Sequence, residues 1–217
     1  MKPLCVIPAR GGSKRLHRKN LALVGGRPLV AWTIEAALES GVFDEVYVSS
    51  EDQEIIDVAR EYGATIPYRR PMELAGDTVT NVAVSLHQVE FMQNQSIHHD
   101  AVVCLQPSSP LRTGAQIAAA WHQFVSDGSD FLISATSIDP HYFHWALENG
   151  EDNKWRMFFG DKFMTVRQDL PAVFRPNGAI KIAKVEALRQ QQNFFGDALS
   201  AFEMSEETSV HVAIEFE

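Results

Sequence analysis

Residues 4–15 read LCVIPARGGSKR, an apolar run that passes directly into a basic loop with two adjacent glycines. The apolar part, Leu4–Pro8, is typical of a buried strand. Gly11 and Gly12 let backbone N–H groups approach a phosphate closely, and the surrounding cations neutralise its charge. The loop contains neither the G-x-x-x-x-G-K-(S/T) pattern of a Walker A motif nor the G-x-G-x-x-G pattern of a dinucleotide fingerprint. We therefore interpret it as a candidate triphosphate loop.

The rest of the chain continues an alternation of strand-like and helix-like segments. We expect strands at Leu4–Pro8, Glu45–Ser49, Thr65–Tyr68, Ala101–Gln106, Phe131–Thr136, Gly178–Ala183 and Ala201–Met204. We expect helices at Leu29–Ser40, Asp52–Tyr62, Val79–Met92, Gly114–Val125 and Lys184–Gln192. Ser50 or Asp52 is a candidate cap for the second helix, and Gly63 follows its end. This order predicts an α/β protein with a largely parallel sheet covered by helices on both faces. Ligands of such sheets bind beyond the carboxyl ends of the strands, here after Ile7 and Leu105.

Length and composition limit the class of protein. A chain of 217 residues predicts one domain, and 45% hydrophobic with 22% charged residues is ordinary for a globular protein. No apolar run reaches the roughly 18 residues that a membrane span needs, so we expect no membrane partner. Cys5 and Cys104 both lie in apolar runs, which predicts buried free thiols and a cytoplasmic protein rather than a disulfide framework.

The charge is distributed unevenly along the chain. A net charge of −9 argues against nonspecific nucleic-acid binding, so no nucleic-acid partner is expected. The first 34 residues nevertheless contain no Asp or Glu. They contain the cations Lys2, Arg10, Lys14, Arg15, Arg18, Lys19 and Arg27. The pattern predicts an anionic ligand near this end, with a solvated basic face as the alternative.

The alternation breaks between residues 138 and 174. Two aromatic-rich stretches, 141–145 and 155–159, are separated by a polar segment. Clustered aromatic side chains are costly when they stay exposed on a monomer. We therefore expect this segment to leave the sheet and to pack against a second subunit in a homodimer.

Four motifs, in the same order along the chain, resemble the acylneuraminate cytidylyltransferases, the CMP-sialic acid synthetase family. They are PARGGSKR at 8–15 followed by Lys19-Asn20, RPMELAGDT at 70–78, LQPSSPLR at 105–112, and RQDLP at 167–171 running into FRPNGAI at 174–180. The resemblance implies a three-layer Rossmann-like nucleotidyltransferase fold with a mostly parallel sheet. It also implies a single domain over residues 1–217, with 138–174 as a dimerisation and sugar-site extension.

The activity that the resemblance implies is transfer of CMP from CTP to the anomeric hydroxyl of an acidic nine-carbon sugar, with release of pyrophosphate. The sugar would be a nonulosonic acid, such as N-acetylneuraminic, legionaminic or a related acid used for surface glycans. Arg10 and Lys19 would be catalytic, since they would offset charge on the α-phosphate and the departing pyrophosphate. The nucleotide would contact Ala9, Arg10, Gly11, Gly12, Ser13, Asn20, Arg70, Asp77, Thr78 and Gln106.

The sugar would contact a second set, Gln106, Arg167, Arg175, Phe194 and Phe195. A guanidinium binds a carboxylate through two parallel hydrogen bonds, which suits a keto-acid sugar better than a neutral hexose. Simpler interpretations stay open for several residues. Asp77 and Thr78 are candidate caps for the helix at Val79, Arg70 is suited to a surface ion pair, and the phenylalanines are suited to the core.

The chain departs from the family pattern near its carboxyl end. The family holds Mg²⁺ with an Asp-Ile-Asp motif, whereas this sequence has His211 and Ala213 at the two aspartate positions, and neither is a good Mg²⁺ ligand. Three explanations stay open. The triphosphate and water carry most of the coordination, with Glu215 or Glu217 assisting; or the site prefers an ion that accepts imidazole; or the protein is catalytically weak.

Two further departures bear on the identity of the sugar. His144 stands where the sialic-acid enzymes have a sugar-contacting lysine, and Lys181 where the family commonly has tyrosine. The sequence therefore leaves two alternatives beside the cytidylyltransferase. One is a catalytically weak nucleotide- or sugar-binding member of the same fold. The other is a nucleotidyltransferase for neutral or phosphorylated sugars, which Arg167 and Arg175 disfavour.

Overall fold

The computed structural model describes residues 1–13 and 16–212, with the backbone alone at Arg167. Its central sheet has six strands in the order β10-β6-β9-β5-β1-β4. The bounds are β1 Pro3–Pro8, β4 Val46–Ser49, β5 Ala101–Leu105, β6 Phe131–Ile138, β9 Val173–Lys184 and β10 Leu199–Glu203. β1 is parallel to β4 and β5, and β6 is parallel to β10. β9 lies antiparallel between β5 and β6. The predicted mostly parallel sheet is confirmed, with β9 as its one antiparallel strand.

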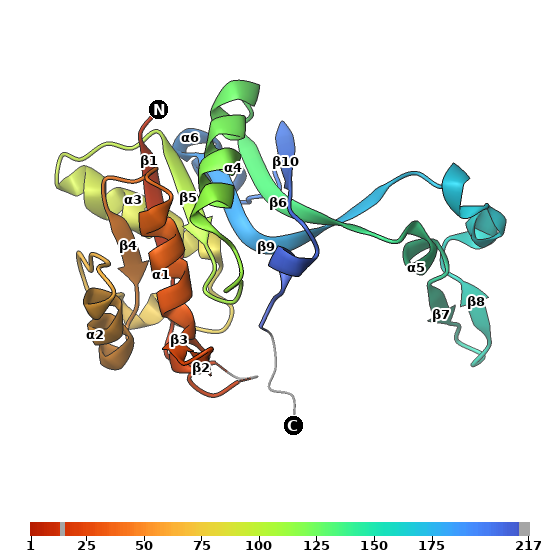
Figure 1. Cartoon of the computed structure of the whole chain (residues 1–217), viewed down its shortest axis with the longest axis horizontal. Helices are drawn as coiled ribbons and strands as arrows, with labels where there is room; N and C mark the ends of the chain where they lie inside the picture. The colour runs from red at the N-terminus through yellow and green to blue at the C-terminus, as the bar shows by residue number, and fades with distance from the viewer. Residues whose placement is uncertain (14–15, 213–217) are drawn as a thin grey trace.

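Helices cover both faces of this sheet (Figure 1). They are α1 Leu29–Glu39, α2 Gln53–Glu61, α3 Asn81–Asn94, α4 Gly114–Asp127 and α6 Val185–Gln191. Because side chains alternate across a strand, Cys5 and Ile7 of β1 pack with α1, α2 and α4, whereas Leu4 and Val6 pack with α3 and α6. The predicted three-layer α/β fold is confirmed. Both cysteines are free and buried, as expected.

Side-chain caps fix where the helices begin. The Asp52 carboxylate accepts hydrogen bonds from the backbone N–H groups of Glu54 and Ile55, so the predicted cap of α2 is confirmed. α3 begins two residues later than expected, and Thr80 Oγ1 accepts from the N–H of Ala83 at 3.2 Å. The interpretation of Asp77 and Thr78 as helix caps is therefore wrong.

The expected strand at Thr65–Tyr68 does not form. Only a single bridge joins Thr65 to Tyr47 of β4. The remaining short elements of the body are the hairpin of β2 Leu23–Val24 and β3 Arg27–Pro28, and the 3₁₀ turns η1 Lys19–Leu21, η2 Met72–Leu74 and η5 Glu207–Ser209. Within the described residues, no helix is both long and apolar enough to cross a membrane.

Residues 139–172 project from the body as an arm (Figure 1). β6 and β9 continue side by side as far as the pair Ile138–Val173, and the segment between them carries the elements of the arm. These are α5 Pro140–His144, β7 Leu147–Asn149, β8 Trp155–Met157, η3 Gly160–Met164 and η4 Arg167–Asp169. Large apolar side chains are exposed on the arm, including Tyr142, Trp145, Trp155 and Phe158. His144 is buried among them, edge-on to Phe143 and Phe159.

Candidate active site

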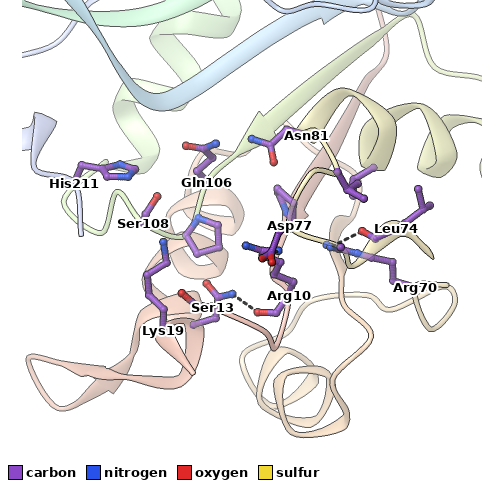
Figure 2. A pocket seen from close by; sticks show the side chains of 16 residues that line it. Arg10, Ser13, Lys19, Arg70, Leu74, Asp77, Asn81, Gln106, Ser108 and His211 are labelled. Atoms are coloured by element: carbon purple, nitrogen blue, oxygen red, sulfur yellow. Dashed lines mark hydrogen bonds and ion pairs between the residues drawn. The ribbon is translucent and has the colours of Figure 1, made fainter. Parts of the chain in front are cut away.

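A pocket of about 290 Å³ opens beyond the carboxyl ends of β1 and β5. It is lined by Pro8, Arg10, Ser13, Lys19, Asn20, Arg70, Leu74, Gly76, Asp77, Val79, Asn81, Val84, Gln106, Pro107, Ser108 and His211. Figure 2 shows Lys19 and His211 on one side of the pocket, Arg70 on the other, and Arg10 with Asp77 between them. The pocket therefore lies where the sheet topology predicts a ligand.

Hydrogen bonds from neighbouring segments hold the loop after β1. The Ala9 N–H donates to the Ser49 carbonyl at 3.0 Å, and the Gly11 N–H donates to Glu51 Oε1 at 2.7 Å. A side chain at Gly11 has no room, since its Cβ would lie 2.5 Å from Asp52 Oδ2. Asn20 donates from Nδ2 to the Arg10 carbonyl at 2.8 Å, so this amide shapes the loop as well as lining the pocket. Ala9 is buried at the end of β1 and does not line the pocket.

The loop side of the pocket is cationic. Arg10 Nη1 lies 2.8 Å from Asp77 Oδ1, and this ion pair holds the guanidinium at the pocket. Lys19 and Ser13 line the same side. Gly12 has open space around the position of a Cβ, so its backbone is accessible. The structure thus brings together Arg10, Ser13, Lys19 and Asn20, as the sequence predicts, while Lys14 and Arg15 of the motif lie outside the described residues.

Arg70 forms the opposite wall. It is only 4% exposed, and its Nε donates to Ser49 Oγ at 2.9 Å while Nη2 donates to the Ser49 carbonyl. Burial lowers the pKa of this guanidinium, and the nearby Glu51 carboxylate acts in the opposite direction. The interpretation of Arg70 as a surface ion pair is therefore wrong. Thr78 is exposed and does not line the pocket.

Gln106 follows β5 and is positioned by a residue that the sequence reasoning missed. Arg112 is buried, and its Nη1 donates to the carbonyls of Gln106 at 3.2 Å and Ala179 at 2.9 Å. Burial lowers the pKa of Arg112 to about 10. Its place in the motif at residues 105–112 was the available signal, but nothing in the pattern indicated that it joins β5 to β9.

The described carboxyl-terminal segment brings His211 to the pocket. The Val212 N–H donates to the Ser108 carbonyl at 2.8 Å, and Asn177 Nδ2 donates to Ser209 Oγ at 2.9 Å. Partial burial lowers the pKa of His211, and Lys19, Arg175 and Lys181 lower it further. The imidazole is therefore neutral near pH 7.

The described residues do not fit a protein-held Mg²⁺ site. They contain no group of three His, Cys, Asp or Glu side chains placed to hold a metal ion. Among the described residues that line the pocket, the one carboxylate is Asp77, which pairs with Arg10. His211 offers a nitrogen where Mg²⁺ prefers oxygen. Ala213, Glu215 and Glu217, which the sequence raised in connection with the metal, lie outside the described residues.

The predicted sugar contacts are spread over different parts of the molecule. Arg175 lies in β9 at the base of the arm and is exposed, whereas the backbone of Arg167 belongs to η4 on the arm itself. Phe194 is 3% exposed and packs in the core with α3 and α6, and Phe195 beside it is 46% exposed. Of the members of this set whose side chains the structure describes, only Gln106 lines the pocket.

This arrangement suits the binding of a polyanion. Arg10, Lys19 and Arg70 line one small pocket, together with Ser13 and Ser108. Preorganised cations of this kind stabilise charge that develops on phosphate oxygens during nucleotidyl transfer.

Comparisons with known proteins agree with this chemistry. Residues 4–152 match a family model described as cytidylyltransferase. The chain is 38% identical over 202 residues to a pseudaminic acid cytidylyltransferase of Campylobacter jejuni, covering 93% of this chain and 87% of that protein. It is 33% identical over 214 residues to an N-acylneuraminate cytidylyltransferase of Streptococcus agalactiae, covering 98% of this chain and 50% of that protein.

A solved structure supports the fold. The CMP:2-keto-3-deoxy-manno-octonic acid synthetase in complex with CTP superposes with a TM-score of 0.69, covering 94% of this chain and 90% of that one. At 16% identity, this likeness bears on the fold alone. The family-model match and the 38% identical relative carry the assignment further: the chain belongs to the cytidylyltransferase family, and it is a nucleotidyltransferase.

Proposed function

We propose that this enzyme transfers CMP from CTP to the anomeric hydroxyl of a nonulosonic acid and releases pyrophosphate. The observation that carries the proposal is the pocket itself, in which Arg10, Lys19 and Arg70 converge beyond the carboxyl ends of β1 and β5. Three cations in one small volume suit a triphosphate, and the reaction needs them most as negative charge moves onto the departing pyrophosphate. Such activated sugars serve surface glycan synthesis, and we expect the enzyme to act in the cytoplasm.

In this proposal the role of each residue follows from its position in the pocket. Arg10 and Lys19 are the catalytic cations at the phosphates, with Ser13, Gly11, Gly12 and Asn20 in the loop that holds them. Arg70 lies on the opposite wall of the pocket, and Asp77 keeps Arg10 in place through their 2.8 Å ion pair. Gln106 stands between the nucleotide and the sugar.

For the sugar we propose pseudaminic acid as the first of the nonulosonic acids to test. The relative of that name is 38% identical to this chain, against 33% for the N-acylneuraminate enzyme. N-acetylneuraminic and legionaminic acids are the next candidates.

We also propose that the arm, within residues 138–174, joins two copies of the chain and contributes to the sugar site. The exposed aromatic side chains on the arm support a homodimer, because such surfaces are costly in water. Arg167 lies on the arm, so a partner copy is the simplest way to bring it near a sugar.

The test is a pyrophosphate-release assay with CTP, each of the three acids, and Mg²⁺ or Mn²⁺ supplied in turn. Because the described residues contain no group of three His, Cys, Asp or Glu side chains placed to hold a metal ion, we expect the divalent cation to arrive with the triphosphate. We expect turnover with CTP and one of the acids, and little with UTP or with sugar 1-phosphates.

The Lys19→Met variant should lose about 100-fold or more in kcat, since it removes a charge that acts on the phosphates. Lys2→Met is the matched control, because Lys2 is exposed, pairs with Asp44 at 3.6 Å and does not line the pocket. CTP binding without turnover on any of the three acids would contradict the proposal.

A further inference from the structure

Strand β9 is irregular where it passes the pocket. Along β6, Ile133 pairs with Lys181, and two residues later Ala135 pairs with Pro176. Four residues of β9 therefore lie opposite the single residue Ser134, whose hydroxyl accepts a hydrogen bond from the Ile180 N–H at 2.8 Å. Bulges of this kind occur beside active sites, where they redirect side chains.

The bulge shortens the distance between two cations on the strand. Arg175 and Lys181 would be about 20 Å apart along a regular strand at 3.3 Å per residue. Their partners on β6, Thr136 and Ile133, are three residues apart, which corresponds to about 10 Å. Both cations lower the pKa of the same imidazole, that of His211 in the pocket wall.

Lys181 lies on the sheet face that continues into the pocket. It pairs with Cys104 of β5, and Gln106, two residues further on, faces the same side. The bulge also approaches Gln106 directly, since a Cβ on Gly178 would lie 3.0 Å from Gln106 Oε1 and 4.0 Å from His211 Nδ1. Lys181 is thus next to the pocket wall formed by Gln106 and His211.

Two aromatic rings lie near the Lys181 ammonium. Its Nζ lies 5.9 Å from the ring centre of Phe194 and 5.8 Å from that of Phe195. Within the described part of the chain, no Asp or Glu forms an ion pair with it. Lys181 is partly exposed on a central strand, so its ammonium is accessible to an anion bound beside it.

We infer that Lys181 binds the carboxylate of the sugar substrate and makes the enzyme specific for acidic sugars. The inference rests on the proposed function and adds to it a residue that distinguishes the acid from a neutral sugar. The Phe195 ring, which is partly exposed, forms the apolar side of this subsite. Arg175, brought near by the bulge, supplies a second positive charge.

The test compares pseudaminic acid with its C1 carboxamide in the wild type and in Lys181→Met. Calorimetry in the presence of an α,β-methylene analogue of CTP gives the Kd of each sugar, and the pyrophosphate assay gives KM. Wild type should bind the acid more tightly than the amide. Lys181→Met should raise the Kd and KM of the acid about 10- to 150-fold, the range expected for one charge-assisted hydrogen bond, and should lose most of the preference for the acid.

Controls separate this role from a structural one. Lys181→Arg should restore most of the preference, and the KM of CTP should stay within about threefold in both variants. Lys184→Met is the matched control, since Lys184 is on the same strand but pairs with Asp130 at 2.8 Å. If Lys181→Met does not fold, Lys181→Gln gives the same comparison.

Either of two binding results would overturn the inference: a wild type that binds the acid no better than the amide, or a Lys181→Met variant that keeps the preference. A rise in the KM of CTP without a change for the sugar would also overturn it. Because calorimetry reads binding alone, a wild type that binds the acid but never releases pyrophosphate would refute the proposed function and leave this inference to be judged by Kd.

Discussion

At the scale of single residues, the pKa of His211 depends on the charged groups that surround it. Partial burial, and then three nearby cations, lower its pKa below the usual 6.5. The charges of a bound triphosphate offset those cations, so the pKa of His211 should rise when CTP binds. A group whose pKa rises on binding takes up a proton at pH values between its free and bound pKa.

Proton uptake on CTP binding is therefore expected near pH 6, and it should vanish at alkaline pH, where the imidazole is neutral in both states, and at low pH, where it is protonated in both. Calorimetric titrations in buffers of different ionisation enthalpy measure the number of protons taken up. CTP itself releases or takes up protons, so the difference between wild type and His211→Asn isolates the histidine. Equal proton uptake by the two proteins at pH 6 would contradict this description of the site.

Some residues of the structure could be predicted from the sequence, and others could not. The cap at Asp52 was predictable because its carboxylate acts on N–H groups two and three positions ahead. Arg10, Lys19 and Asn20 were recognisable from their motif. Arg112 was not, because its role depends on contact with the Ala179 carbonyl, 67 residues away in the chain.

At the scale of elements, the bulge of β9 is the feature that shapes the site. Gly178 within it has φ of 75°, a left-handed conformation that other residues adopt at a cost, and its Cβ position is 3.0 Å from Gln106 Oε1. The strand also carries Asn177, whose Oδ1 accepts from the Ala179 N–H at 3.1 Å and whose Nδ2 reaches Ser209. The bulge thus links β9, Gln106 and the segment that carries His211.

We predict that Gly178→Ala loses about 1–2 kcal/mol of unfolding free energy from the left-handed backbone and at least tenfold in kcat/KM from displacement of Gln106. Gly128→Ala is the matched control, with φ of 66° and open space around its Cβ position. It should lose a similar stability and keep its activity. Chemical denaturation and the pyrophosphate assay measure the two effects. Full activity in a folded Gly178→Ala would show that the bulge does not position Gln106.

The elements themselves were largely predictable, since their apolar periodicity is local. The antiparallel placement of β9 was not, because the strand-like run at Gly178–Ala183 carries no signal of its direction or of its partners. β9 begins earlier than expected, at Val173, because Val173–Pro176 pairs with β6 at the base of the arm. Thr65–Tyr68 has strand-like composition but makes only one bridge at the sheet edge.

At the scale of the whole molecule, the arm is the part that most needs a further surface to pack against. In the part of the chain that the structure describes, strands β7 and β8 of the arm pair only with each other, and Trp155 is 66% exposed. A two-stranded hairpin is marginally stable alone, so the arm needs a surface to pack against. The aromatic composition of the segment already indicated in the sequence that it packs against another surface. The direction in which the arm projects was not indicated, because it follows from the lengths of β6 and β9.

We predict that light scattering gives twice the 24.2 kDa chain mass. Trp155→Asp should shift the protein towards monomer and lower the kcat/KM for the sugar more than for CTP, because it places a charge on the predicted contact surface. Val125→Asp is the control, since Val125 is 45% exposed on α4 of the body. A monomeric wild type with full activity would contradict the predicted dimer.

The central claim is CMP transfer from CTP to an acidic sugar, and ³¹P NMR tests it most directly. A reaction of the enzyme with CTP, pseudaminic acid and Mg²⁺ should yield a new phosphodiester signal from the CMP-sugar, growing in equal amount with pyrophosphate. Replacing the sugar by a neutral hexose 1-phosphate should yield none. Unchanged CTP with all three acids and with either metal, or CMP formed without a sugar phosphodiester, would contradict the account.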